Sequence, residues 1–315
     1  MLRLRSLAKI NLDLRVLHKR RDGFHELRTV FQTISLADTI EMEHRRGRGK
    51  LELTSNVDIP GNLILKAADL VFRACKATCH LRVRLTKRIP MGGGLGGGSS
   101  NAATILLALP AILGKALPFE KLLEIAAELG SDVPFFLIGG TAVGLGRGTE
   151  LYPLPDVPPS RGIVITSGVH SSTPLAFAAL KRQLLDESPA PIIQTFQSFV
   201  LLACSPTPAP RTPSVNDFEP VVFARHPQLE SIKNKLLQLG AWRAMMTGSG
   251  SAVFGLFPSR ERRDRALGRV RREFPGNQVY PFTTVSRGRY RTMWWRQSGV
   301  STQSKTWPPQ DRSER

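Results

Sequence analysis

The feature that most constrains this chain is a glycine-rich run at residues 92–98, in which six of seven residues are glycine. Such a run cannot fill a core, but its backbone can adopt positive φ and approach a ligand closely. Residues 81–86 before it alternate apolar and polar, which predicts a half-buried strand. Ser99, Ser100 and Asn101 after it are helix-capping residues that precede an apolar stretch. A glycine loop between a strand and a helix N-terminus presents free N–H groups, and it therefore predicts an anion site, most often for phosphate.

Two familiar phosphate loops fit this run poorly. A Walker loop requires a lysine after its second glycine, and none follows Gly97 or Gly98. Glycines 92, 94 and 97 have the Gly-x-Gly-x-x-Gly spacing, but a dinucleotide fold also needs a strand that ends in an acidic residue roughly 20 positions later. Residues 119–129 instead predict an amphipathic helix. A flexible linker is the remaining alternative, and we disfavour it because the run lies between a patterned strand and a patterned helix.

Composition narrows the class of protein. Hydrophobic residues make up 41% of the chain, which is enough for a full core. The odd number of cysteines argues against a disulfide scaffold and favours a reducing, cytoplasmic location. Cys75, Cys79 and His80 have a metal-like spacing, but no second ligand cluster accompanies them, so we interpret the two cysteines as buried thiols. No signal-peptide pattern and no 18-residue apolar run occurs, so we expect no membrane segment.

The net charge of +19 is unusually basic, and residues 258–315 carry 14 Lys and Arg against 5 Asp and Glu. Such a region either contacts nucleic acid or forms a solvated face. No zinc-finger, helix-turn-helix or RNA-binding pattern accompanies the charge. We therefore favour the solvated face and expect no nucleic-acid partner.

Strand and helix patterns mix without strict alternation, which predicts an α+β protein of two lobes with mixed sheets and helices. In the first half we predict a hairpin of strands 6–17 and 27–43 around a turn at 20–25, a strand at 51–54, helices at 62–76 and 119–129, and a break near Pro110 in the helix after the glycine run. A proline-rich stretch at 152–160 separates predicted domains 1–152 and 160–297. The second half predicts strands at 162–166 and 252–257, helices at 174–185 and 229–239, a low-order segment at 188–214 and a disordered tail at 298–315.

Three further segments place reactive or flexible residues in an apolar setting. Lys9 and Asn11 interrupt an apolar strand, although an isolated lysine can also extend to solvent. Residues 130–134 read Gly-Ser-Asp-Val-Pro, where Asp132 is either a helix cap or a catalytic carboxylate. Residues 246–254 form a second small-residue loop that enters a strand, and an ordinary glycine turn would look the same. On the residues alone these alternatives stay open.

Taken together, the segments resemble the GHMP kinase superfamily. Residues 90–102 follow its phosphate loop with one extra glycine and with Asn101 inserted, and Ser131 replaces an alanine usual before the catalytic aspartate. The resemblance implies a two-lobed ATP-dependent small-molecule kinase with its active site in the cleft between the lobes. It assigns Asp132 as the acceptor of the proton from the attacking hydroxyl, and Lys9 as the group that stabilises Asp132 and the developing alkoxide.

The same resemblance implies the phosphate site and the metal. Because the loop has no Walker lysine, Mg²⁺ would be held by a hydroxyl of Ser99 or Ser100. Asn62 is a weaker candidate for the nucleotide, since it could equally be a helix cap, and Lys87 is one for the phosphates. The loop residues expected to bind ATP phosphates are Pro90, Met91, Gly92, Gly93, Gly94, Leu95, Gly96, Gly97, Gly98, Ser99 and Ser100.

Within the superfamily, the chain resembles the 4-diphosphocytidyl-2-C-methyl-D-erythritol kinases. The resemblance lies in the glycine loop and in residues 21–27, 173–177 and 215–219. It implies that cytosine stacks between Phe24 and Phe177, that His25 reads its hydrogen-bonding edge, and that Asn11 and Thr173 bind the substrate. Phe24 stands where the family usually has tyrosine, so any contact of that hydroxyl is lost.

The implied reaction is ATP-dependent phosphorylation of the 2-hydroxyl of CDP-methylerythritol, a step of the non-mevalonate isoprenoid pathway. The implied partners are that substrate and ATP with Mg²⁺, and we expect a cytoplasmic monomer or weak homodimer. Two alternatives remain from the sequence. One is a mevalonate- or homoserine-type kinase, which would not need the set Phe24, His25 and Phe177. The other is a basic nucleic-acid-binding protein on a degenerate kinase fold.

Overall fold

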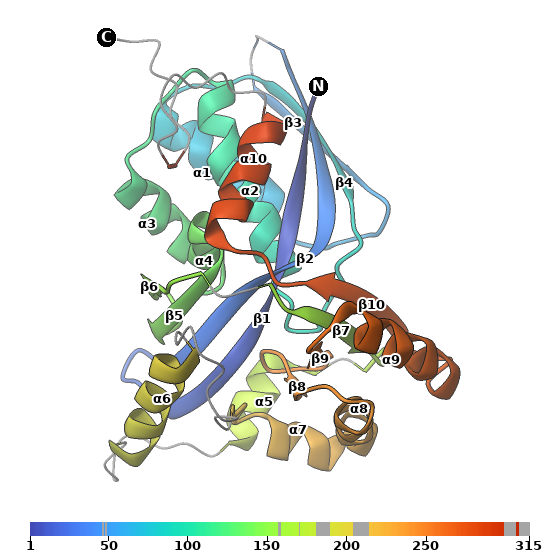
Figure 1. Cartoon of the computed structure of the whole chain (residues 1–315). Helices are drawn as coiled ribbons and strands as arrows, with labels where there is room; N and C mark the ends of the chain where they lie inside the picture. Colours follow the sequence, from blue (N-terminus) through green and yellow to red (C-terminus); the bar gives the residue numbers. More distant parts are fainter. Residues whose placement is uncertain are drawn as a thin grey trace.

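The computed structural model describes residues 1–45, 47, 49–156, 159–169, 171–180, 190–203, 214–298 and 307–308. These residues form two lobes, each built on its own sheet (Figure 1). The α+β class predicted from the sequence is confirmed.

The first lobe is built around a long antiparallel hairpin. Its two strands pair from Leu2–Met42 at one end to Lys19–His25 at the other, around a tight turn in which the Arg20 N–H donates to the Phe24 carbonyl at 2.7 Å. The opposite edge of β2 binds β5 near its start and β4 near its end. The six strands of this sheet are β1 (Leu2–Lys19), β2 (His25–Arg45), β3 (Lys50–Ser55), β4 (His80–Thr86), β5 (Thr141–Gly146) and β6 (Glu150–Pro153).

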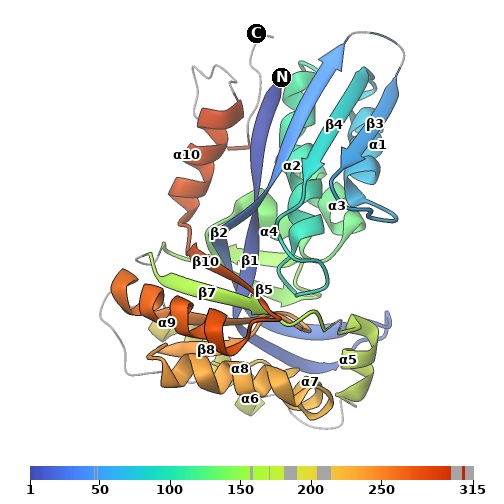
Figure 2. The same ribbon diagram turned by 90° about the vertical axis from the view of Figure 1, so that its right-hand side faces the viewer.

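Helices cover one face of this sheet, as the view in Figure 2 shows. They are α1 (Leu63–Cys75), α2 (Gly97–Ile112), α3 (Phe119–Leu129) and α4 (Val133–Ile138). Helix α2 is buried on nearly every side, which makes it the central helix of the lobe. The helix α2 ends at Ile112, two residues after Pro110, so the predicted break lies within one turn of the observed end. Packing around this last turn keeps it helical despite the proline.

The second lobe is an antiparallel sheet in the order β10-β7-β9-β8, with helices against it (Figures 1 and 2). Buried side chains of β7, β8 and β9 pack with those of α5, α7, α8 and α9 in one core. The elements are β7 (Arg161–Thr166), β8 (Arg243–Met246), β9 (Val253–Phe257), β10 (Gln278–Thr283), α5 (Thr173–Ala179), α6 (Ala190–Ala203), α7 (Glu219–Arg225), α8 (Pro227–Gln238) and α9 (Arg260–Glu273).

Two segments of this lobe differ from the sequence predictions or extend beyond the described residues. The segment 188–214 was expected to have low order, but residues 190–203 form α6, and this prediction was wrong there. The helix is stabilised by burial of Phe196 and Phe199 in the core that joins β1 and β2 to the second sheet. The helix expected at 174–185 corresponds to α5, and residues 181–185 of that prediction lie outside the described residues.

The two lobes share a core. Ile10 of β1 and Ile34 of β2 belong to one buried cluster with Phe254 of β9. Beyond the second sheet, α10 (Arg287–Ser298) returns to the first lobe, where Trp294 joins the core beneath the helices. The domain limits 1–152 and 160–297 stay a prediction.

Most of the tail predicted to be disordered, residues 299–306 and 309–315, lies outside the described residues. Trp307 within it packs against the first core. Cys75 and Cys79 are free and buried, while Cys204 is outside the description. No helix among the described residues is long and apolar enough to cross a membrane.

Candidate active site

Three loops bind the edge of β1 that does not pair with β2, and these loops are candidate functional segments from the sequence. Here the backbone N–H of Lys9 donates to the Leu95 carbonyl of the glycine loop at 3.0 Å, and that of Asn11 donates to the Thr247 hydroxyl at 3.0 Å. Five residues from Lys9, the Leu14 N–H donates to the Val215 carbonyl at 2.7 Å. One strand edge thus aligns three loops that are far apart in the sequence.

Lys9 and Asp132 meet beside this edge. The Lys9 Nζ lies 3.3 Å from Asp132 Oδ2, and its side chain is only 3% exposed while that of Asp132 is 34% exposed. Lys9 therefore does not extend to solvent. Asp132 is the N-cap residue of α4, yet its side chain makes no capping hydrogen bond. Helix capping therefore does not explain why an aspartate occupies this position. Its carboxylate faces a cavity that Lys9, Asn11 and Ser131 also line.

Asn11 fixes the lysine. Residues two apart on a strand project to the same face, and Lys9 Nζ donates to Asn11 Oδ1 at 2.8 Å. The same oxygen accepts from the Gly248 N–H at 2.9 Å, and the Asn11 amide donates to Thr29 Oγ1 at 2.8 Å. With its hydrogen bonds used in this way, Asn11 holds the Lys9 ammonium beside Asp132.

The glycines of the loop are required by close backbone approach. Gly94 has φ +73°, and a Cβ there would lie 2.1 Å from the Thr247 carbonyl oxygen. Gly96 is the N-cap of α2 in the left-handed region, and a Cβ there would lie 2.8 Å from the Phe136 ring and 3.1 Å from Lys9 Cγ. The loop is therefore pressed against the 247–251 loop on one side and against the Lys9 side chain on the other.

The two serines at the start of α2 differ. Ser100 is buried, and its hydroxyl accepts from the Ser6 hydroxyl at 2.7 Å. Ser99 is half-buried and lines the cavity together with Gly94 and Asp132. A hydroxyl that faces the cavity can reach a metal bound to phosphate oxygens, whereas one held in the core cannot.

Two weaker candidates lie elsewhere. Lys87 is buried behind the loop, where its Nζ donates to Asp38 Oδ2 at 2.7 Å and to the Ile89 carbonyl at 2.6 Å. Burial lowers the pKa of Lys87, and the nearby Asp38 carboxylate opposes that shift. Lys87 is not among the described residues that line the cavity of Lys9 and Asp132.

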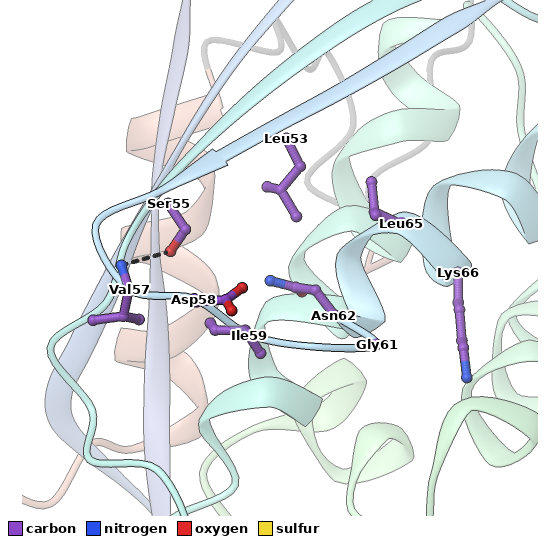
Figure 3. Close-up of a pocket in the computed structure, with 9 residues that line it drawn as sticks. All are labelled: Leu53, Ser55, Val57, Asp58, Ile59, Gly61, Asn62, Leu65 and Lys66. Carbon is purple, nitrogen blue, oxygen red and sulfur yellow. Dashed lines mark hydrogen bonds between the residues drawn. The ribbon is translucent and has the colours of Figure 1, made fainter.

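Asn62 lies on a separate hollow. Its Oδ1 accepts from the Ile64 N–H at 3.0 Å, so it caps α1. It also lines a hollow of about 530 Å³, where its amide nitrogen and the Asp58 carboxylate point toward one another (Figure 3). Leu53, Ile59 and Leu65 add apolar surface to this hollow. Asn62 is therefore both a cap and a lining residue.

The far end of the main cavity, which measures about 730 Å³, is aromatic. The His25 and Phe177 rings stack with centroids 4.6 Å apart, and Phe218 meets Phe177 edge-on at 4.8 Å. The Arg147 guanidinium lies 3.5 Å from the centroid of Phe24. Burial lowers the pKa of His25, with the charges of Lys19 and His18 adding to the effect. The Thr173 hydroxyl lies at the same end, 2.7 Å from that of Ser249.

Comparisons with known proteins agree with this geometry. The model of the GHMP kinases N terminal domain matches residues 62–140, and that of the GHMP kinases C terminal domain matches residues 211–276. The 4-diphosphocytidyl-2-C-methyl-D-erythritol kinase of Solibacter usitatus is 50% identical over 98% of this chain and 96% of its own length. The chain belongs to this family of GHMP kinases.

Other relatives of the family are more distant. The kinase of the same name from Thermotoga petrophila is 41% identical over 80% of this chain and 91% of its own. A crystal structure of 4-(cytidine 5'-diphospho)-2C-methyl-D-erythritol kinase superposes with a TM-score of 0.73 at 33% identity, covering 90% of this chain and 98% of that one. A homoserine kinase from Cytophaga hutchinsonii superposes with a TM-score of 0.67 at 18% identity, covering 89% of this chain and 94% of that one, and it shares the fold.

Sequence reasoning missed several residues that shape the site of this GHMP kinase. Arg147 lines the cavity from the turn between β5 and β6, and only the glycines around it could have marked that turn. Asn216 belongs to the segment 215–219 that carries the family resemblance, but its role was not predicted: it donates to the carbonyls of Met246 and Gly248 at 2.9 Å each and so holds the second loop. Asp38 is a lone carboxylate in an apolar strand, which is the same signal that identified Lys9.

Proposed function

We propose that this chain transfers the γ-phosphoryl group of ATP to the 2-hydroxyl of 4-diphosphocytidyl-2-C-methyl-D-erythritol. The observation that carries the proposal is that one cavity contains both the Lys9–Asp132 pair and the aromatic end around His25 and Phe177. A hydroxyl held at the first and a cytosine at the second belong to one extended substrate. The reaction is a step of isoprenoid biosynthesis without mevalonate.

In this proposal Asp132 accepts the proton of the attacking hydroxyl. A carboxylate that is partly exposed to the cavity can contact that hydroxyl, and a positioned base accelerates such a step by typically 10² to 10⁴-fold. Lys9, held 3.3 Å from Asp132 and 2.8 Å from Asn11, places a fixed positive charge where the alkoxide develops. A charge that is already oriented stabilises the transition state without reorganisation.

The ATP phosphates bind to residues 90–100 at the N-terminus of α2, where free backbone N–H groups and the helix dipole favour anions. Magnesium fits this site because Ser99 presents a hydroxyl to the cavity, while Ser100 does not. Bound there with the phosphates, the metal would neutralise their charge during transfer. Lys87 supports the loop from behind, since a Cβ at Gly97 would lie 2.7 Å from its Nζ.

The hollow beside Asn62 is the candidate site for the adenine base. It combines apolar surface from Leu53, Ile59 and Leu65 with the polar groups of Asn62 and Asp58. A flat heterocycle with polar edges requires this kind of lining.

Cytosine stacks between Phe24 and Phe177 in this account. In the structure Arg147 lies over the Phe24 ring and His25 stacks on the Phe177 ring. The bound cytosine takes the place of these two partners. Because its pKa is lowered, His25 is neutral near pH 7 and offers one donor and one acceptor to the base edge. Stacking accepts any base, so these hydrogen bonds supply the discrimination. The cytoplasmic location and the monomer or weak homodimer belong to the proposal as well.

A coupled ADP-release assay with Mg-ATP tests the proposal, with CDP-methylerythritol, mevalonate and homoserine offered side by side. We expect turnover of the cytidylated alcohol alone. Turnover of mevalonate or homoserine in its place would retain Lys9 and Asp132 but reject the cytosine site. No turnover of any of the three, combined with salt-sensitive binding to random DNA or RNA, would reject the kinase activity altogether.

A further inference from the structure

The C-terminal part of the chain holds the short helix that carries Asp132. Helix α4 begins directly after Asp132 and spans Val133–Ile138. Helix α10 returns from the second lobe along the first, where the Gln297 side chain accepts from the Arg5 N–H of β1 at 2.9 Å (Figure 1). Neither α10 nor Trp307 lies within the regions that match the two kinase domain models.

Two side chains from this region bind the C-terminal end of α4. The last carbonyls of a helix have no partner within it and must find one elsewhere. The Tyr290 hydroxyl donates to the Phe136 carbonyl at 2.7 Å, in a buried setting. The Trp307 Nε1 donates to the Leu137 carbonyl at 2.7 Å. These contacts fix the helix at the end opposite Asp132.

The surroundings of Tyr290 leave α4 little room to move. Gly139 ends the helix with φ +67°, and a Cβ there would lie 2.4 Å from the Tyr290 ring. Arg287, at the start of α10, donates to the Thr141 carbonyl at 2.6 Å. Hydrogen bonds from α10 and the tail therefore reach the chain on both sides of Gly139.

An aromatic cluster makes this attachment rigid. Trp307 meets the rings of Trp294, Trp295 and Tyr290 edge-on, with centroids 5.8, 6.1 and 6.1 Å apart. Trp294 is 4% exposed and belongs to the core of the first lobe. Its own Nε1 has no hydrogen-bond partner within the described part of the chain.

We infer that Tyr290 and Trp307 are positioning residues that set Asp132 against Lys9 through α4. A helix of six residues is about 9 Å long and behaves as one rigid body, so a shift at its end is felt at its start. The inference rests on the proposed role of Asp132. It assigns a catalytic consequence to Trp307, which lies in a segment expected from the sequence to be a disordered tail.

The test compares three conservative variants of the full-length chain. Tyr290→Phe and Trp307→Phe each remove one hydrogen bond to α4 and keep a ring. Trp294→Phe is the matched control, because it changes a tryptophan of the same cluster that donates no hydrogen bond within the described residues. We expect kcat to fall on the order of 10-fold for the first two and less than about 2-fold for the control. KM for both substrates should change less than about 2-fold. Trp307→Ala should lower kcat further.

A merely structural role predicts a different pattern. Melting temperatures and assays well below them exclude loss of folded enzyme. In an Asp132→Asn background, adding Tyr290→Phe should change the residual turnover less than about 2-fold, because residues that act through one group are not additive. A full additional loss there, or equal losses in all three single variants, would overturn the inference. Normal turnover of Asp132→Asn would reject the proposed role of Asp132 itself. An inactive Asp132→Asn, together with normal turnover of Tyr290→Phe and Trp307→Phe, would reject only the positioning role.

Discussion

Two lysine–aspartate pairs lie next to the same glycine loop, and they differ in how completely they are enclosed. Lys87 and Asp38 are 6% and 0% exposed and 2.7 Å apart. The remaining oxygen of Asp38 accepts from the N–H groups of Arg88 and Ile89 at 2.7 and 2.8 Å. In the second pair Lys9 is equally buried, but Asp132 is 34% exposed, lies 3.3 Å away and faces the cavity.

The difference shows that environment, and not residue type, separates a supporting pair from a reactive one. A buried carboxylate whose oxygens are all hydrogen-bonded has no free site for a substrate hydroxyl. Removing one partner of such a buried ion pair strongly destabilises the folded protein. A carboxylate with one fixed ammonium beside it and one side open can accept a proton. Both lysines pack directly against the glycine loop, since a Cβ at Gly97 would lie 2.7 Å from Lys87 Nζ and one at Gly96 would lie 3.1 Å from Lys9 Cγ.

The largest expected effect separates the two lysines. Lys9→Met should lower kcat about 10² to 10³-fold, because it removes the charge aimed at the developing alkoxide. Lys87→Met should instead lower the free energy of unfolding by about 3 to 5 kcal/mol, because it leaves Asp38 buried without its partner. Steady-state kinetics and urea unfolding of both variants measure this. Equal kinetic losses per folded molecule would erase the distinction between the pairs.

The two serines at the start of α2 should show the same contrast between an enclosed and a cavity-facing group, here in the binding of Mg²⁺. Ser99→Ala should raise the Mg²⁺ concentration needed for half-maximal rate about 10-fold or more, since it removes a cavity-facing hydroxyl. Ser100→Ala should leave that requirement unchanged and lower stability by about 1 kcal/mol, the ordinary value of a lost hydrogen bond. A magnesium titration of both variants decides between them. The reversed result would place the metal on Ser100.

Substitutions of Phe24 test substrate binding at the aromatic end of the cavity, away from the two lysine–aspartate pairs. Phe24→Ala should raise KM for the cytidylated substrate about 10-fold with kcat unchanged, because a base stacked on an aromatic ring contributes about 1 to 3 kcal/mol. Phe24→Tyr restores the ring usual in the family and should change KM less than about 3-fold. A drop in kcat for Phe24→Ala would show instead that the ring acts on the reacting end.

The smallest effect concerns pH. The pKa of His25 is lowered from its ordinary value of 6.5 by burial and by Lys19 and His18. A histidine that binds its proton more weakly in the folded state contributes full stability above pH 6.5, and loses it as pH falls further. Protonation also removes the acceptor that His25 offers to the base, so KM for the cytidylated substrate should rise as pH falls, with the midpoint of the rise below 6.5. A midpoint at or above 6.5 would mean that the pKa of His25 is not lowered.

The parts of the site that could be predicted are those whose residues are out of place locally. Glycines beside a strand, a lysine in an apolar strand and an aspartate between glycine and proline each conflict with ordinary packing. Asp38 gave the same signal and was missed, because its role depends on Lys87, which lies 49 residues away. Such a pairing follows from strand register and not from local pattern.

Tertiary contacts explain the other differences. Prolines around residues 189–191 favoured low order, but Phe196 and Phe199 of α6 gain enough burial against the shared core to order the helix. Trp307 sits in a polar stretch without periodicity, and its partner Leu137 is 170 residues away. Arg147 faces the cavity only because the turn between β5 and β6 lies beside Phe24.

The most direct test of the account compares Asp132→Asn with Asp38→Asn in one preparation series. Turnover per folded molecule is measured with CDP-methylerythritol and Mg-ATP, and the free energy of unfolding is measured in urea. We predict that Asp132→Asn loses about 10² to 10⁴-fold in kcat with unchanged stability. Asp38→Asn should lose stability by about 3 to 5 kcal/mol while its folded molecules retain most of their turnover. Normal turnover of Asp132→Asn, or a stable but inactive Asp38→Asn, would contradict the account.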